Sequence, residues 1–131
     1  MIQNLKYKWR SLVIGIKNLI KWAPVIYKDR DWDHWFIYQI LKTKLQHQAD
    51  YVLKHGHLEN STKYAQQMLK CIEMIDIVQN EKIIDDYLLS IDVRSGNELS
   101  CDDVVEADAK QAQAKKDLFQ YMEENIDHWW D

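Results

Sequence analysis

Residues 28–35 hold the densest cluster of side chains that could recognise a ligand, in the run Lys-Asp-Arg-Asp-Trp-Asp-His-Trp. Lysine and arginine pair with anionic groups, arginine through two parallel hydrogen bonds. Tryptophan offers a flat face on which a planar ring can stack. The predicted ligand contacts are Lys28, Arg30, Trp32, His34 and Trp35. The competing interpretation is an acidic helix start whose tryptophans enter the core.

The alternating aspartates of this run, Asp29, Asp31 and Asp33, have the spacing that opens a calcium-binding loop. Such a loop needs glycine at its sixth position for the turn and glutamate at its twelfth as a bidentate ligand. Here these positions are His34 and Ile40. The sequence therefore argues against a calcium loop.

Two Glu-x-x-Asp pairs, Glu73 with Asp76 and Glu124 with Asp127, offer a different chemistry. A spacing of three places both carboxylates on one helical face, where they could share Mg²⁺. The second pair resembles the acidic motif of all-α nucleoside triphosphate pyrophosphatases, with Asp127 where that family has a second glutamate. Acidic residues at this spacing are also common on solvated helix faces. The alternative hypothesis is therefore a Mg²⁺-dependent enzyme that uses these four residues.

The histidines and cysteines form no complete site by sequence. His55 and His57 flank Gly56 at a helix end, where imidazoles suit the helix dipole, and we predict no metal there. Two cysteines make no disulfide scaffold, which favours a reducing cytoplasm. Cys71 lies in an apolar helical run and is predicted to be a small core residue.

The adjacent tryptophans Trp129 and Trp130 end the chain before Asp131. Neighbours on a helix diverge by about 100°, so both cannot face one core. One of them must pack on another element, an oligomer partner or a ligand. We predict that this pair contributes to assembly or to a shared pocket.

Helical periodicity predicts the elements that position these residues. Apolar residues recur at intervals of three and four over 5–21, and Pro24 is expected to end that helix, with 25–28 as an extended link. A second helix is predicted to begin within 29–33 and to reach 53, with Gly56 as its stop. A third helix should run from about residue 60 to residue 89, and the sequence allows a break in it near Asn80.

Residues 90–101 lose this periodicity and contain Ser-Gly-Asn, so we predict a longer loop there. A final helix should follow from Asp102 or Asp103. These elements predict an all-α, single-domain bundle of about four helices over residues 1–131. The apolar run near the N-terminus is interrupted by Lys17 and Lys21, so no membrane span or secretory signal is expected.

The composition narrows the function further. Only 3 Gly and 1 Pro among 131 residues argue against hairpin-rich folds and glycine-lined phosphate loops. The net charge of −4 divides unevenly: residues 1–54 hold ten Lys/Arg and four Asp/Glu, whereas residues 55–131 hold seven and seventeen. The first part could suit a nucleic acid, a membrane surface or a partner helix, but the acidic pI near 5.7 argues against nucleic acid.

The run Lys-Asp-Arg-Asp-Trp-Asp at 28–33, together with the closing Trp-Trp-Asp, resembles small helical accessory proteins of tailed bacteriophages. The resemblance covers about a quarter of the chain, mainly residues 16–35. It implies an accessory protein that acts in the cytoplasm of the bacterial host. It supplies no catalytic residue, and it leaves open a role in which a helical oligomer sequesters a nucleotide signal of host immunity.

Together these observations predict a non-enzymatic protein without a cofactor that binds an anionic ligand, such as a nucleotide, and self-associates. A sequestering protein needs stacking faces and phosphate donors but no reactive group. The alternatives are the Mg²⁺-dependent enzyme and a structural module that binds or inhibits a host protein.

Overall fold

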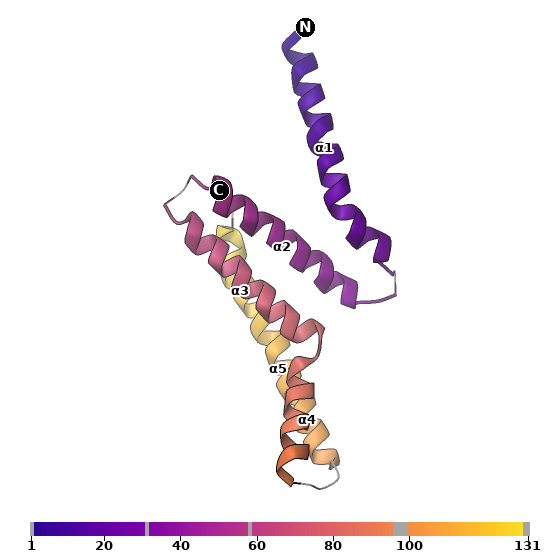
Figure 1. Cartoon of the computed structure of the whole chain (residues 1–131). Coiled ribbons are helices and arrows are strands. Elements are labelled where there is room, and N and C mark those ends of the chain that lie inside the picture. The colour runs from indigo at the N-terminus through magenta and orange to yellow at the C-terminus, as the bar shows by residue number, and fades with distance from the viewer. Residues whose placement is uncertain (1, 31, 58, 96–99, 130–131) are drawn as a thin grey trace. The chain divides into compact units, whose positions relative to one another are not determined.

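The computed structural model describes residues 2–30, 32–57, 59–95 and 100–129. These residues form only helices, which confirms the all-α prediction (Figure 1). None of the described helices is long and apolar enough to cross a membrane. The elements are α1 (Ile2–Lys28), α2 (Trp35–His55), α3 (Ser61–Gln79), α4 (Lys82–Ser95), α5 (Cys101–Asn125) and a 3₁₀ helix, η1 (Ile126–His128).

Contacts between residues group the chain into two compact units, Met1–Ile40 and Leu41–Asp131. The first contains α1, the turn that follows it and the start of α2. The second contains the rest of α2 and the helices α3 to α5. One domain over residues 1–131 stays a prediction, because the compactness of each unit does not decide whether the two unfold together.

Helix α1 is longer than its sequence predicts. The expected stop at Pro24 is wrong, since Pro24 lies inside α1 and the helix continues to Lys28. Proline removes one backbone hydrogen bond, but its own φ is helical, so the following residues can extend the helix. The predicted extended link over 25–28 is therefore one more helical turn.

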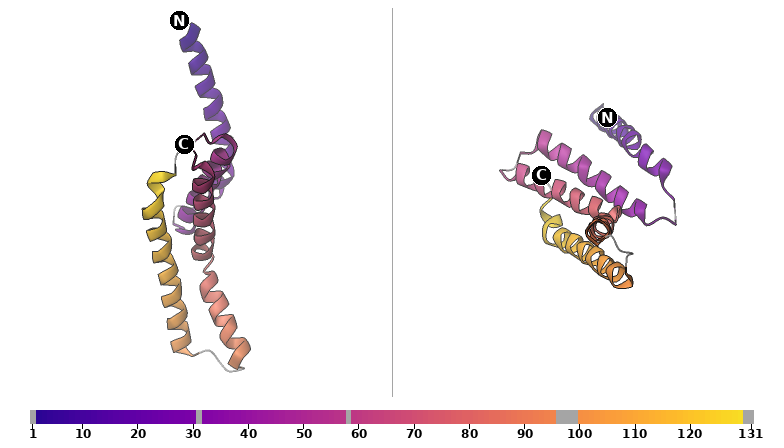
Figure 2. Two further views of the ribbon diagram at one scale, coloured as in Figure 1. Left: turned by 90° about the vertical axis from the view of Figure 1, so that its left-hand side faces the viewer. Right: turned by 60° about the horizontal axis from the view of Figure 1, so that its bottom comes forward.

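In the second unit, α3 and α4 follow one another and α5 runs back alongside both (Figures 1 and 2). The break expected near Asn80 is confirmed, and it divides the predicted third helix into α3 and α4. The Asn80 amide donates to the backbone oxygen of Asp76 at 3.0 Å. Glu81 then adopts a left-handed φ of 51°, which ends the α-helical path.

Apolar side chains from α2, α3 and α5 form the core of this unit. Met68, Cys71, Ile75 and Leu118 are its largest fully buried side chains. Leu45, Ala49 and Val52 add the buried stripe of α2, at the spacing expected for one helical face. The core position predicted for Cys71 is confirmed.

Two connections differ in how well the sequence predicted them. Gly56 follows the last residue of α2, and its N–H donates to Val52 O at 2.7 Å, as its predicted role as a stop requires. A Cβ at Gly56 would lie 2.5 Å from the Cβ of Ser61, so the close approach needs glycine. The predicted loop over 90–101 is shorter than expected, because α4 continues through Ser95. Residues 96–99 of that prediction lie outside the described residues.

Candidate functional site

A tight turn connects α1 to α2 and carries the predicted ligand contacts. The Asp33 N–H donates to Arg30 O at 2.9 Å, which closes the turn. The Asp33 carboxylate accepts from the Trp35 N–H at 2.9 Å and so covers a free donor at the start of α2. These short-range bonds fix the backbone of a segment that has no regular secondary structure.

A surface pocket of about 390 Å³ opens at this turn. That volume lies within the range of small-molecule sites. Three of the five predicted contacts, Arg30, Trp32 and His34, line it. The pocket is further lined by Asp29, Asp33, Phe36, Ile37 and Ile40.

The three predicted residues that line the pocket are all exposed, but they differ in their hydrogen bonds to the turn. Trp32 is 83% exposed, so most of its ring is open to solvent. Arg30 is exposed, and its Nη1 donates to Asp29 O at 3.0 Å. One of its guanidinium nitrogens is thus held to the turn, and the remaining N–H groups can donate elsewhere. His34 is exposed as the last residue before α2.

The other two predicted contacts, Lys28 and Trp35, do not line the pocket. Lys28 is the last residue of α1 and is exposed. Trp35 begins α2, and its ring meets that of Phe36 edge-on, with 5.2 Å between the ring centroids. The contiguous run therefore divides into a pocket group and two flanking residues.

The carboxylates of the pocket were not predicted as contacts. Among the described lining residues, Asp29 and Asp33 accompany one guanidinium, which gives these residues a net charge of −1 when His34 is counted as neutral. The net charge of these residues therefore does not attract an anion. Recognition of an anionic ligand would depend on directed hydrogen bonds and stacking. The apolar lining residues Ile37 and Ile40 could have been found from their spacing of three residues, which places them on one helical face.

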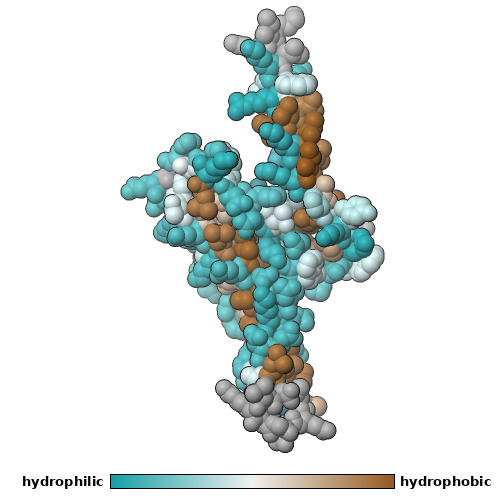
Figure 3. Space-filling model, viewed as in Figure 1, coloured by the Kyte–Doolittle hydropathy of each residue, from teal (hydrophilic) through white to brown (hydrophobic). Residues whose placement is uncertain are grey.

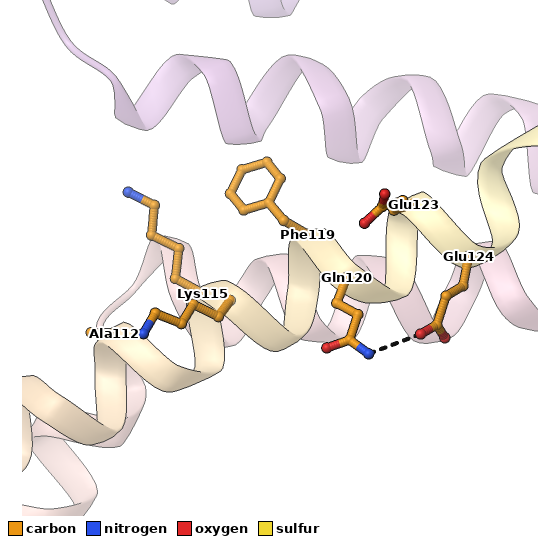
Figure 4. Close-up of a pocket in the computed structure, with 7 residues that line it drawn as sticks. Ala112, Lys115, Phe119, Gln120, Glu123 and Glu124 are labelled. Atoms are coloured by element: carbon orange, nitrogen blue, oxygen red, sulfur yellow. Dashed lines mark hydrogen bonds between the residues drawn. The ribbon is translucent and has the colours of Figure 1, made fainter.

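A second, larger pocket of about 720 Å³ runs along α5 (Figure 4). Phe119 and Glu123 point to one side of this helix, whereas Gln120 donates to Glu124 at 2.9 Å on another. The lining residues are Ala112, Lys115, Lys116, Phe119, Gln120, Glu123 and Glu124. All of them belong to one helix, which cannot enclose a small molecule by itself.

One carboxylate of each acidic pair in the enzyme hypothesis, Asp76 or Glu124, has a partner within the protein. Asp76 accepts from Lys42 Nζ at 3.1 Å and forms a second ion pair with Lys82. Hydrogen bonds from Lys82 and Lys42 hold the pKa of Asp76 below its usual value of 3.8. Glu73 and Asp127 are exposed. No group of three or more His, Cys, Asp or Glu residues in the described chain could hold a metal.

The remaining candidate side chains take ordinary structural positions. The rings of His55 and Tyr51 lie 5.0 Å apart at the end of α2. Burial raises the pKa of the Cys71 thiol to about 11, so this thiol is protonated at neutral pH. A protonated, buried thiol is a poor nucleophile.

Trp129 belongs to the core rather than to an open surface. It is 3% exposed, its ring centroid lies 6.5 Å from that of Tyr121, and its backbone oxygen accepts from Gln48. Its indole N–H is buried without a protein partner among the described residues. Trp130, which completes the predicted interface pair, lies outside the described residues.

The turn after α1 is therefore the place where the structure brings predicted recognition residues together. It offers a guanidinium, an open indole, an imidazole and two carboxylates together with the apolar side chains of Phe36, Ile37 and Ile40. This set can hold a ligand but shows no arrangement of nucleophile and base. Comparisons with protein-family models, curated proteins and solved structures find no match for this chain.

Proposed function

We propose that this protein is a non-enzymatic binding protein and that the pocket at the turn after α1 takes a nucleotide-like ligand. The observation that carries the proposal is the shared pocket of Arg30, Trp32 and His34. The arginine would pair with the phosphate and the indole would stack on the base.

The carboxylates of the pocket favour a nucleotide over a simple anion. Asp29 and Asp33 would repel inorganic phosphate, but a carboxylate accepts hydrogen bonds from the amino groups of a base. A ligand that carries an anionic group, a planar ring and N–H donors therefore matches the whole lining. Sulfate or phosphate alone matches only Arg30.

The resemblance to bacteriophage accessory proteins supports the same class of function. Sequestering a nucleotide signal of the host needs a binding site and no reactive group. Self-association is a further part of this proposal, and it depends on Trp130, because Trp129 is already packed in the core. If light scattering finds a monomer, the self-association proposal is refuted and the nucleotide proposal is unaffected.

A thermal-shift screen of linear and cyclic nucleotides tests the proposal. At 100 times its dissociation constant, a ligand that binds only the folded state adds about 2.7 kcal/mol to the free energy of unfolding. We expect such a rise for at least one nucleotide and none for inorganic phosphate. The absence of stabilisation by any nucleotide at millimolar concentration would refute the proposal.

Nucleotide binding by substituted proteins tests whether the ligand occupies this pocket. Trp32→Ala should weaken binding by about 1–3 kcal/mol, the contribution of one stacked base. Arg30→Gln should weaken nucleotides more than the corresponding nucleosides, because it removes only the phosphate contact. Trp9→Ala is the matched control, since Trp9 is an exposed tryptophan of α1 that does not line the pocket.

A further inference from the structure

Helix α1 carries a continuous apolar stripe whose side chains are open to solvent. In Figure 3 the apolar residues gather along one side of this helix. Trp9, Leu12, Ile16 and Leu19 recur at intervals of three and four residues, so they share a helical face. Each of them is between 48% and 69% exposed. Tyr27 extends the stripe near the end of α1 and is 87% exposed.

A row of cations follows the polar side of the same helix. Lys6, Arg10, Lys17, Lys21 and Lys28 follow one another at intervals of four and seven residues, which places them along one side of the helix. All five are exposed. At a rotation of about 100° per residue, the centre of this row lies about 130° from the centre of the stripe, so the cations occupy the polar side of the helix. With Lys8, α1 holds six cations and no Asp or Glu.

We propose that α1 binds flat on the surface of an anionic phospholipid bilayer. An amphipathic helix with cations along its polar face and Trp, Leu and Ile on the other lies in the plane of the headgroups. A bilayer presents negative charge along the whole length of such a helix. It therefore complements a row of cations that extends from Lys6 to Lys28. A protein surface would need an equally uniform acidic strip. The lysines within α1 favour lying on the bilayer over crossing it.

Binding of the full chain to lipid vesicles tests this inference. Co-sedimentation with vesicles that contain phosphatidylglycerol should show binding, accompanied by a blue shift of tryptophan emission. Binding to pure phosphatidylcholine vesicles should be much weaker, and added salt should weaken binding to the anionic vesicles. If the chain does not bind anionic vesicles at low salt, the inference is wrong.

Two substitutions at neighbouring positions distinguish the contribution of the apolar stripe from the effect of a change in net charge. Leu19→Glu places a carboxylate in the stripe and should weaken vesicle binding at least about tenfold. Asn18→Glu introduces the same acidic side chain on the polar side of the helix, about 140° from the centre of the stripe, and should retain more of the binding. Equal losses for the two variants would overturn the inference.

The cations are tested by Lys17→Gln combined with Lys21→Gln, which leaves the stripe intact. Each cation near an anionic surface contributes about 1 kcal/mol, so the double variant should bind about thirtyfold more weakly. Circular dichroism should show unchanged helix content in every variant. If Leu19→Glu instead converts an oligomer into a monomer without lipid, the stripe is a contact between copies and the lipid proposal fails. The nucleotide proposal is independent of this result, because none of these residues lines the pocket.

Discussion

At the scale of single residues, Asp76 is the best-connected carboxylate of the described chain. It accepts hydrogen bonds from Lys42 at 3.1 Å and from the Asn80 amide at 3.0 Å, and it pairs with Lys82. These partners come from α2, from the end of α3 and from α4. One side chain therefore joins three helices near the α3–α4 break.

Asp76→Asn should lower the free energy of unfolding by about 1 kcal/mol at neutral pH, as expected for a network whose aspartate is still 35% exposed. The folded-state pKa lies below the usual 3.8, so the contribution is present well above that pH. It is lost as the pH falls through the lowered pKa, because protonation removes the charge. Urea unfolding at a series of pH values should show the two proteins converging in acid. Glu73→Gln, an exposed carboxylate on the same helix, is the control; if it matches Asp76→Asn at every pH, the network contributes nothing.

At the scale of elements, capping side chains help to fix where a helix begins. The start of α5 has a complete capping box: the Asp103 N–H donates to Ser100 Oγ at 3.2 Å, and the Ser100 N–H donates to the Asp103 carboxylate at 3.0 Å. These bonds satisfy two donors that a helix start would otherwise leave open. Hydrogen bonds from the Ser100 hydroxyl, at 2.7 Å, and from the Ser100 N–H lower the pKa of Asp103. The sequence placed the cap at Asp102 or Asp103, whereas Ser100 occupies it.

Ser100→Ala should destabilise the protein by about 1 kcal/mol through loss of the cap. The measurement is the urea midpoint at neutral pH, with an unchanged slope. Ser90→Ala is the matched control, because Ser90 lies inside α4, where its exposed hydroxyl donates to Tyr87 O at 2.7 Å. The control should change stability by less than about 0.5 kcal/mol. Equal effects of the two substitutions would show that the capping box does not stabilise α5.

At the scale of the whole molecule, the buried core lies almost entirely in one unit. Among the residues whose burial the structure describes, Tyr38 is the only buried apolar residue before residue 41, and the rest extend from Leu45 to Trp129. Helix α1, by contrast, exposes most of its large apolar side chains. The buried core and the largest exposed apolar face therefore lie in different parts of the chain.

A fragment of residues 35–131 should consequently fold by itself. It keeps α2 whole and retains every residue of the buried core. We expect cooperative urea unfolding with a midpoint close to that of the full chain, because burial of apolar surface is the main favourable term. Loss of the cooperative transition would show that residues 1–34 are needed for the core. Without α1 and the turn, the same fragment should bind neither vesicles nor nucleotides.

The candidate site could be predicted largely because its residues are contiguous. Arg30, Trp32 and His34 share a pocket through hydrogen bonds that span two or three residues. Contacts of such short range follow from the order of side chains along the chain. The roles of Asp29 and Asp33 were missed, because an aspartate that caps a helix and one that faces a ligand look the same in a sequence.

The sequence by itself determined that this protein is helical, that its third predicted helix breaks near Asn80 and that the predicted ligand contacts Arg30, Trp32 and His34 are neighbours. Those properties depend on residues three or four positions apart. Only the tertiary structure decided that Trp129 enters the core and that Asp76 meets Lys42, thirty-four residues away. The reason is that such contacts depend on which helix faces pack together, and the periodicity of each helix specifies a face but not the element that covers it.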